Sequence, residues 1–129
     1  MLSWVIMVRR DPPQPTTTLI GREAEARACA FLQQQGLILI ERNFRCRVGE
    51  IDLIMRDAQT LVFVEVRCRK DRRFGGAAAS VGRVKQQRLL RSASAYLSRL
   101  ARPPACRFDL IAIEGDALHW IRHLQLSAG

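Results

Sequence analysis

The stretch GEIDLIMRDAQTLVFVEVRCRK, from Gly49 to Lys70, contains two apolar runs that are each interrupted by an acidic residue. The acids are Asp52 and Glu65, and an unpaired carboxylate costs several kcal/mol to bury. The apolar runs on either side of the sequence DAQ predict two strands that pair antiparallel through a short turn. This pairing brings Asp52 and Glu65 within reach of each other at the end of the hairpin remote from the turn. Side-chain alternation then gives the first strand one face with Glu50, Asp52 and Ile54 and an opposite face with Ile51, Leu53 and Met55.

The rest of the chain predicts an α-β-β-β-α-β order. A helix is expected from Thr18, its N-cap, to Gln35, with Gly36 as its C-terminal stop. Strands follow at residues 37–45, 50–56, 60–67 and 106–115, and residues 117–126 form either a fifth strand or a short helix. A helix at about residues 80–100, with Val84 and Leu97 on its inner side, connects the third and fourth strands, which should therefore be parallel. The predicted fold class is α/β, with a mixed central sheet flanked by helices.

The charge of the chain points to a polyanionic partner. The formal net charge is +9 and the isoelectric point is near 10.9, which favours nucleic acid first and an anionic membrane surface second. The N-terminal MLSWVIMVRR is too short to span a bilayer, so no membrane association is expected. The four cysteines have neither zinc-site nor disulfide spacing, which indicates the cytoplasm. Residues 1–18, rich in proline and threonine near their end, are expected to be a mobile leader before a single domain at 19–129.

Asp52 and Glu65 raise the question of what neutralises them. Two nearby carboxylates repel each other, and a divalent cation such as Mg²⁺ or Mn²⁺ removes the conflict. Glu25, at the margin of the inner face of the first helix, is a third acid that could reach the same pocket. The alternative is a surface network of ion pairs, in which Arg45, Arg47 and Arg67 neutralise the acids.

At this point the chain resembles the YraN-like bacterial proteins, the uncharacterised protein family 0102, which look like members of the PD-(D/E)xK nuclease superfamily. The resemblance runs from about Gly21 to Leu124 and rests on AEARACAFLQQQGLILIERNFR, GEIDLI, VFVEVRCR, VGRVKQQRLLRSASAYL and RFDLIAI. It implies a restriction-endonuclease-like αβββαβ core, with Asp52 as the metal-binding aspartate and Glu65 as the second acid. Glu25 resembles the glutamate of the first helix. Arg67 stands where the motif has lysine, and a guanidinium stays protonated, so it can stabilise phosphate charge but cannot act as a base.

These observations together predict a Mg²⁺- or Mn²⁺-dependent endonuclease that hydrolyses nucleic-acid phosphodiesters. Aromatic residues make up only 6% of the chain, which favours duplex or branched DNA over a stacking platform for single strands. The expected phosphate contacts are Arg69, Lys70, Arg72, Arg73, Arg83, Lys85, Arg88 and Arg91. Resolution of a DNA junction needs two active sites, so a symmetric homodimer is compatible with this function. The alternative is a basic nucleic-acid-binding module that keeps the fold without the chemistry.

Two other groups of polar residues receive a structural interpretation. His119 and His123 could share a metal ion only if their segment were helical. Asp109 is expected to pair with Arg107 or to cap the sheet.

Overall fold

The computed structural model describes residues 13–69 and 82–126, with side chains described from residue 20 to 68 and from 82 to 126. The elements in chain order are α2 (Pro13–Gln34), β1 (Ile38–Cys46), β2 (Gly49–Asp57), β3 (Thr60–Arg69), α3 (Arg83–Leu97), β4 (Cys106–Glu114) and β5 (Ala117–Ile121). This confirms the predicted α-β-β-β-α-β order, and the last segment is a strand. No helix in the described ranges is long and apolar enough to cross a membrane.

Helix α2 begins at Pro13, earlier than the predicted start at Thr18. The prediction that Thr18 is the N-cap is therefore wrong, because this residue lies inside the helix. Prolines are tolerated in the first turn because the first backbone N–H groups of a helix have no intrahelical acceptor. Gly36 ends the helix as predicted: it has a φ of 100°, and the N–H of Leu37 returns to the carbonyl of Leu32 at 3.0 Å. Residues 1–12 of the expected leader lie outside the described residues.

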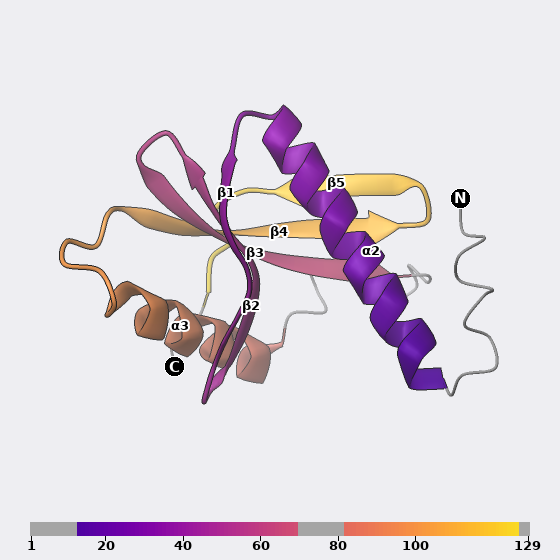
Figure 1. Ribbon diagram of the computed structural model, residues 1–129, viewed down its shortest axis with the longest axis horizontal. Helices are drawn as coiled ribbons and strands as arrows, with labels where there is room; N and C mark the ends of the chain where they lie inside the picture. Colours follow the sequence, from indigo (N-terminus) through magenta and orange to yellow (C-terminus); the bar gives the residue numbers. More distant parts are fainter. Residues whose placement is uncertain (1–12, 70–81, 127–129) are drawn as a thin grey trace.

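The five strands form one mixed sheet in the order β1-β2-β3-β4-β5. Strands β3 and β4 are parallel, from Leu61 opposite Cys106 to Arg69 opposite Glu114, and the other neighbours are antiparallel. Helix α3 lies between β3 and β4 in the chain, as predicted for a parallel crossover (Figure 1). The predicted fold class, an α/β protein with a mixed central sheet flanked by helices, is confirmed.

Two apolar cores lie on opposite faces of the sheet. Side chains of β3 alternate between them: Val62 and Val64 pack with α2, whereas Phe63 packs with Ala93 and Tyr96 of α3. The helices therefore cover different faces, and any contact between groups on α2 and α3 requires an opening in the sheet.

The predicted side-chain alternation of β2 fails at one residue. Leu53 and Met55 face α2 as a pair, but Ile51 packs with Ile54 in the core under α3. Pairing between β2 and β3 reaches only to Leu53, while β2 stays paired with β1. A two-stranded ribbon twists more strongly than a full sheet, which explains why Ile51 turns to the other side.

Helix α3 is shorter than predicted, and its inner face differs from the prediction in the first turn. It begins at Arg83, and its buried residues are Leu89, Ser92, Ala93 and Tyr96. This face, extended one turn toward the N-terminus, includes Lys85 rather than Val84. Val84 is 62% exposed, so the prediction that it lies on the inner side is wrong. Leu97 is half-buried against the core, as predicted.

Asp109 ties the end of the chain to the sheet. Its side chain is fully buried, and its two oxygens accept hydrogen bonds from the Arg107 guanidinium, Trp120 Nε1 and the backbone N–H of His123, at 2.9–3.1 Å. This confirms the expected pairing with Arg107. His119 lies within β5 and His123 after it, so the helical arrangement that would let them share an ion is not formed.

Because Asp109 satisfies three partners at once, Asp109→Ala should lower the free energy of unfolding by about 3 to 5 kcal/mol, the usual cost of breaking a buried pair. Asp109→Asn, which keeps the size and two acceptor sites on one oxygen, should lose less. Asp116→Asn, at an exposed position, is the control. Urea denaturation measures all three, and a loss below about 1 kcal/mol in Asp109→Ala would show that the network does not hold the C-terminal segment.

Candidate functional site

The candidate site lies where β2 separates from β3. The paired residues extend from Asp57 and Thr60 to Leu53 and Val64. Asp52 is the next residue of β2, and its Oδ2 accepts the backbone N–H of Val66 at 2.8 Å. A side chain thus takes the place of a backbone acceptor, which leaves the Asp52 carboxylate inside the opening between the strands.

Glu65 lies beside Asp52, and one of its carboxylate oxygens forms ion pairs with two basic side chains. Its side chain is only 5% exposed, and Oε2 lies 3.3 Å from Lys85 Nζ and 3.6 Å from an Arg67 guanidinium nitrogen. The other oxygen, Oε1, is the only buried side-chain oxygen or nitrogen of the described residues that receives no hydrogen bond from a nitrogen or hydroxyl donor. A hydrogen bond between the Asp52 and Glu65 side chains, which lowers the pKa of Asp52, needs a proton on one of the two carboxyl groups. Burying an oxygen without a hydrogen-bond partner costs folding free energy, unless a ligand supplies the missing partner.

Glu25 brings a third carboxyl group from α2. Burial raises its pKa to about 7, together with the negative charge of Asp52 and a hydrogen bond to Asp52, while a hydrogen bond with Asn43 acts in the opposite direction. Asp52 therefore interacts with Glu25 on one side and with Glu65 on the other. We call Glu25, Asp52 and Glu65 the acid cluster. The opening between β2 and β3 thus brings a carboxyl group of α2 next to the carboxyl groups of the two strands.

The acid cluster retains protons at neutral pH. The pKa of Glu65 is raised to about 7, first by burial and then by the charge of Asp52, against the opposing effect of Lys85 and Arg67. Burial also raises the pKa of Asp52. Displaced pKa values in a group of neighbouring acids are typical of functional sites, although structural networks can produce them too.

The structure brings together all four residues of the predicted catalytic set, Glu25, Asp52, Glu65 and Arg67. It adds Lys85, which the sequence analysis placed among the surface contacts to nucleic acid. The signal was the spacing of four residues between Lys85 and Leu89, which puts the lysine on the buried face of α3. Asn43, which adjoins Glu25, was missed because its place in β1 carries no motif.

The surface network proposed as the alternative is present only in part. Arg67 pairs with Glu65, but Arg45 pairs with Glu50 at 3.2 Å rather than with Asp52. The buried acids are therefore not neutralised by the turn arginines.

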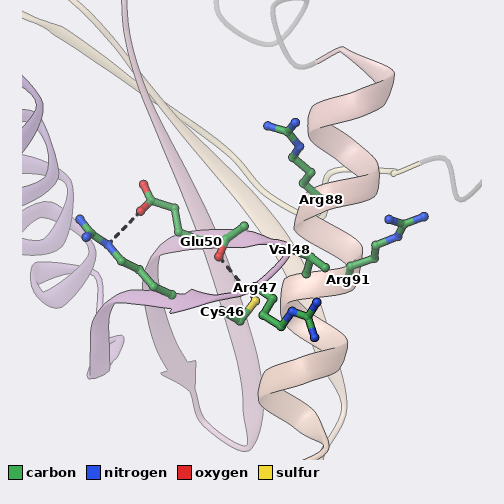
Figure 2. Close-up of a pocket in the computed structure, with 8 residues that line it drawn as sticks. Cys46, Arg47, Val48, Glu50, Arg88 and Arg91 are labelled. Carbon is green, nitrogen blue, oxygen red and sulfur yellow. Dashed lines mark hydrogen bonds and ion pairs between the residues drawn. The ribbon is translucent and has the colours of Figure 1, made fainter.

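The other predicted phosphate contacts divide into two groups. Arg83, Arg88 and Arg91 are exposed on α3, and the last two line a hollow beside the β1–β2 turn (Figure 2). The Arg69 side chain and Lys70, Arg72 and Arg73 lie outside the described residues.

Two carboxylates are the most that the acid cluster is expected to offer to a metal ion. In residues 13–69 and 82–126, no three His, Cys, Asp or Glu side chains form a group that could hold one by themselves. Asp52 and Glu65 fit an ion of the Mg²⁺ type, which is commonly bound by one or two carboxylates and otherwise by water and substrate phosphate. The unpartnered Oε1 of Glu65 supports this fit.

The fold and site define an α/β protein with a cluster of carboxyl groups and two cations in an opening of its sheet. Residues 24–113 match the uncharacterised protein family UPF0102, and the chain belongs to this family. A UPF0102 protein of Janthinobacterium sp. (strain Marseille) is 52% identical over 111 residues, which is 86% of this chain and 90% of that protein. A UPF0102 protein of Cupriavidus metallidurans is 57% identical over 112 residues, covering 86% of this chain and 84% of the relative.

The raised pKa of Glu65 predicts a stability that falls as the pH rises. Between the ordinary pKa of 4.5 and about 7, the folded state holds a proton that the unfolded state has lost, so the free energy of unfolding decreases across this window. Glu65→Gln removes the titration. Relative to this variant, the parent should lose on the order of 2 to 3 kcal/mol between pH 4 and pH 8.

Urea denaturation at several pH values in EDTA measures this difference. Glu23→Gln, which removes a carboxyl group of α2 outside the acid cluster, is the control and should follow the profile of the parent. A constant difference between the parent and Glu65→Gln at all pH values would contradict the raised pKa.

Proposed function

We infer that the chain is a divalent-metal-dependent nuclease that hydrolyses phosphodiesters of nucleic acid, with duplex or branched DNA as its substrate class. The observation that carries this inference is the Glu65 carboxylate, which has one oxygen on two cations and the other buried without a partner beside Asp52. The spacing of Asp52, Glu65 and Arg67 resembles the PD-(D/E)xK pattern, and this resemblance supports the same reaction.

Asp52 and Glu65 would hold Mg²⁺ or Mn²⁺, which lowers the pKa of bound water and stabilises charge on the phosphate when it is present. The Val66 N–H fixes Asp52 Oδ2, so its carboxylate keeps its orientation as the substrate arrives. Glu25, with a pKa of about 7, can accept a proton from a water molecule at neutral pH or orient that water.

Arg67 and Lys85 supply the positive charge of the site. Both reach Glu65 Oε2, so either can move from this carboxylate toward a phosphate oxygen without leaving the acid cluster. A cation aimed at developing negative charge is a common source of rate enhancement. Lys85 thus provides, from α3, the ammonium group that the strand lacks at position 67.

A basic nucleic-acid-binding module is the second candidate. It is favoured by Arg67 at the motif lysine position and by the lack of a third ligand in the described acid cluster. Such a module would bind DNA in a salt-sensitive manner without cutting it.

Incubation of the purified protein with linear, nicked, flapped and four-way DNA, in Mg²⁺, Mn²⁺ or EDTA, tests the proposal. Asp52→Asn should reduce metal-dependent cleavage by about a hundredfold or more, because it removes charge from the ion's site. Asp116→Asn, which removes an exposed carboxylate, is the matched control and should cut as the parent does. Equal cleavage by the parent and Asp52→Asn would assign the activity to a contaminant, and DNA binding without cleavage would favour the module.

Arg67 provides a further test of the site's electrostatics. If it contributes only positive charge, Arg67→Lys should retain most of the cleavage rate, whereas Arg67→Ala should lose about a hundredfold. Single-turnover rates at saturating protein separate this effect from a loss of DNA binding. An Arg67→Ala variant that cuts at the parent's rate would leave Lys85 as the sole cation that the reaction uses.

A further inference from the structure

A basic hollow of about 600 Å³ lies between the β1–β2 turn and α3 (Figure 2). Its lining includes the arginines Arg45, Arg47, Arg88 and Arg91, together with Cys46 and Glu50. Glu50 is the only acid among the described residues of this lining, and its Oε1 lies 3.2 Å from Arg45 Nε. We call this feature the arginine hollow.

Close packing holds the two walls of the arginine hollow together. A Cβ atom at Gly49 would lie 3.0 Å from the Ser92 hydroxyl, a tighter contact than most side chains make, so glycine allows the turn to approach α3 without displacing Ser92. The Cys46 thiol lies 3.6 Å from the same hydroxyl. The arginines of the turn and of the helix are therefore carried on backbones fixed relative to each other before any ligand arrives.

Three of the four arginines have no acidic partner in the part of the chain that the structure describes. The salt bridges and hydrogen bonds of residues 20–68 and 82–126 do not include Arg47, Arg88 or Arg91, and all three are exposed. Like charges gathered in one concave site repel each other, and an anion that binds there relieves this repulsion. The planar guanidinium group is also the side chain best suited to phosphate.

The arginine hollow adjoins the acid cluster. Burial is the main cause that raises the pKa of both Glu25 and Asp52, and the negative charge of Glu50 adds to it in each case. Asp52 follows Glu50 by two residues, which is about 7 Å along a strand. This distance corresponds to roughly one nucleotide step between phosphates of a strand, which is longer than the axial rise of about 3.4 Å because the backbone winds around the axis.

We propose that the arginine hollow binds a backbone phosphate of a nucleic-acid strand, one or two nucleotides from the phosphate that lies at the acid cluster. This inference rests on the proposed function and extends it to Arg45, near the end of β1, and Arg47, in the turn that follows. The hollow sets the position of the strand, because a phosphate held there determines which phosphodiester reaches Asp52 and Glu65.

The test compares two double variants with equal loss of charge. R47Q/R91Q removes one arginine from each wall of the hollow, and R56Q/R102Q removes two exposed arginines that lie away from it. Binding of a duplex is measured in EDTA at several salt concentrations, so that cleavage does not interfere. R47Q/R91Q should weaken binding by about tenfold and reduce the salt slope by about 0.9 for every phosphate that the variant no longer neutralises.

The binding comparison of the two double variants has three possible outcomes. A parent that binds DNA, with R47Q/R91Q weakened far beyond R56Q/R102Q, supports the proposal. Equal weakening of the two double variants overturns it and leaves the proposed nuclease function intact. A parent that does not bind DNA in EDTA or in Ca²⁺ overturns both.

Alkylation of Cys46 gives a second readout that does not depend on the variants. This thiol lines the arginine hollow, whereas Cys106 lies at the start of β4, opposite Leu61, and serves as the internal reference. Bound duplex should slow iodoacetamide modification of Cys46 relative to Cys106, as measured by mass spectrometry of peptides. Protection by inorganic phosphate but not by duplex would overturn the nucleic-acid assignment, as would equal modification of Cys46 with and without DNA.

Discussion

The hydrogen bond from the Val66 N–H to Asp52 Oδ2 is the constraint on which the acid cluster depends. Val66 belongs to a strand that pairs with β4 on its other side, so its N–H must find an acceptor where the pairing of β2 with β3 ends. Asp52 supplies that acceptor with its side chain, so a carboxylate lies between the two strands. Glu25 of α2 then interacts with Asp52, and Lys85 of α3 pairs with Glu65.

The balance of charge in this opening explains why the acids are tolerated. Glu65 alone would be an uncompensated buried carboxylate, but it has two cations on Oε2 and a pKa displaced to about 7. Asp52 has the Val66 N–H, and Glu25 has Asn43. Glu65 Oε1 is the one buried side-chain oxygen of the described residues that lacks a hydrogen-bond partner, and the proposed metal ion would complete it.

Much of the fold follows from the sequence because short turns and alternating apolar residues determine which strands pair. The same pairing predicted that Asp52 and Glu65 meet. Lys85 was predicted to be a surface contact because Val84 is its more apolar neighbour, although the spacing of four residues between Lys85 and Leu89 was a signal for the buried face. The sequence also did not predict that Ile51 faces α3. Its orientation follows from the twist of β1 and β2 where β3 no longer pairs with them, and not from the residue type.

The separation of the acid cluster along the chain has a consequence for biosynthesis. Glu25, Asp52 and Glu65 leave the ribosome before Lys85, so a nascent chain carries the acids without the ammonium group that neutralises one of them. A chain that ends before α3 has Arg67 but not Lys85 to pair with Glu65.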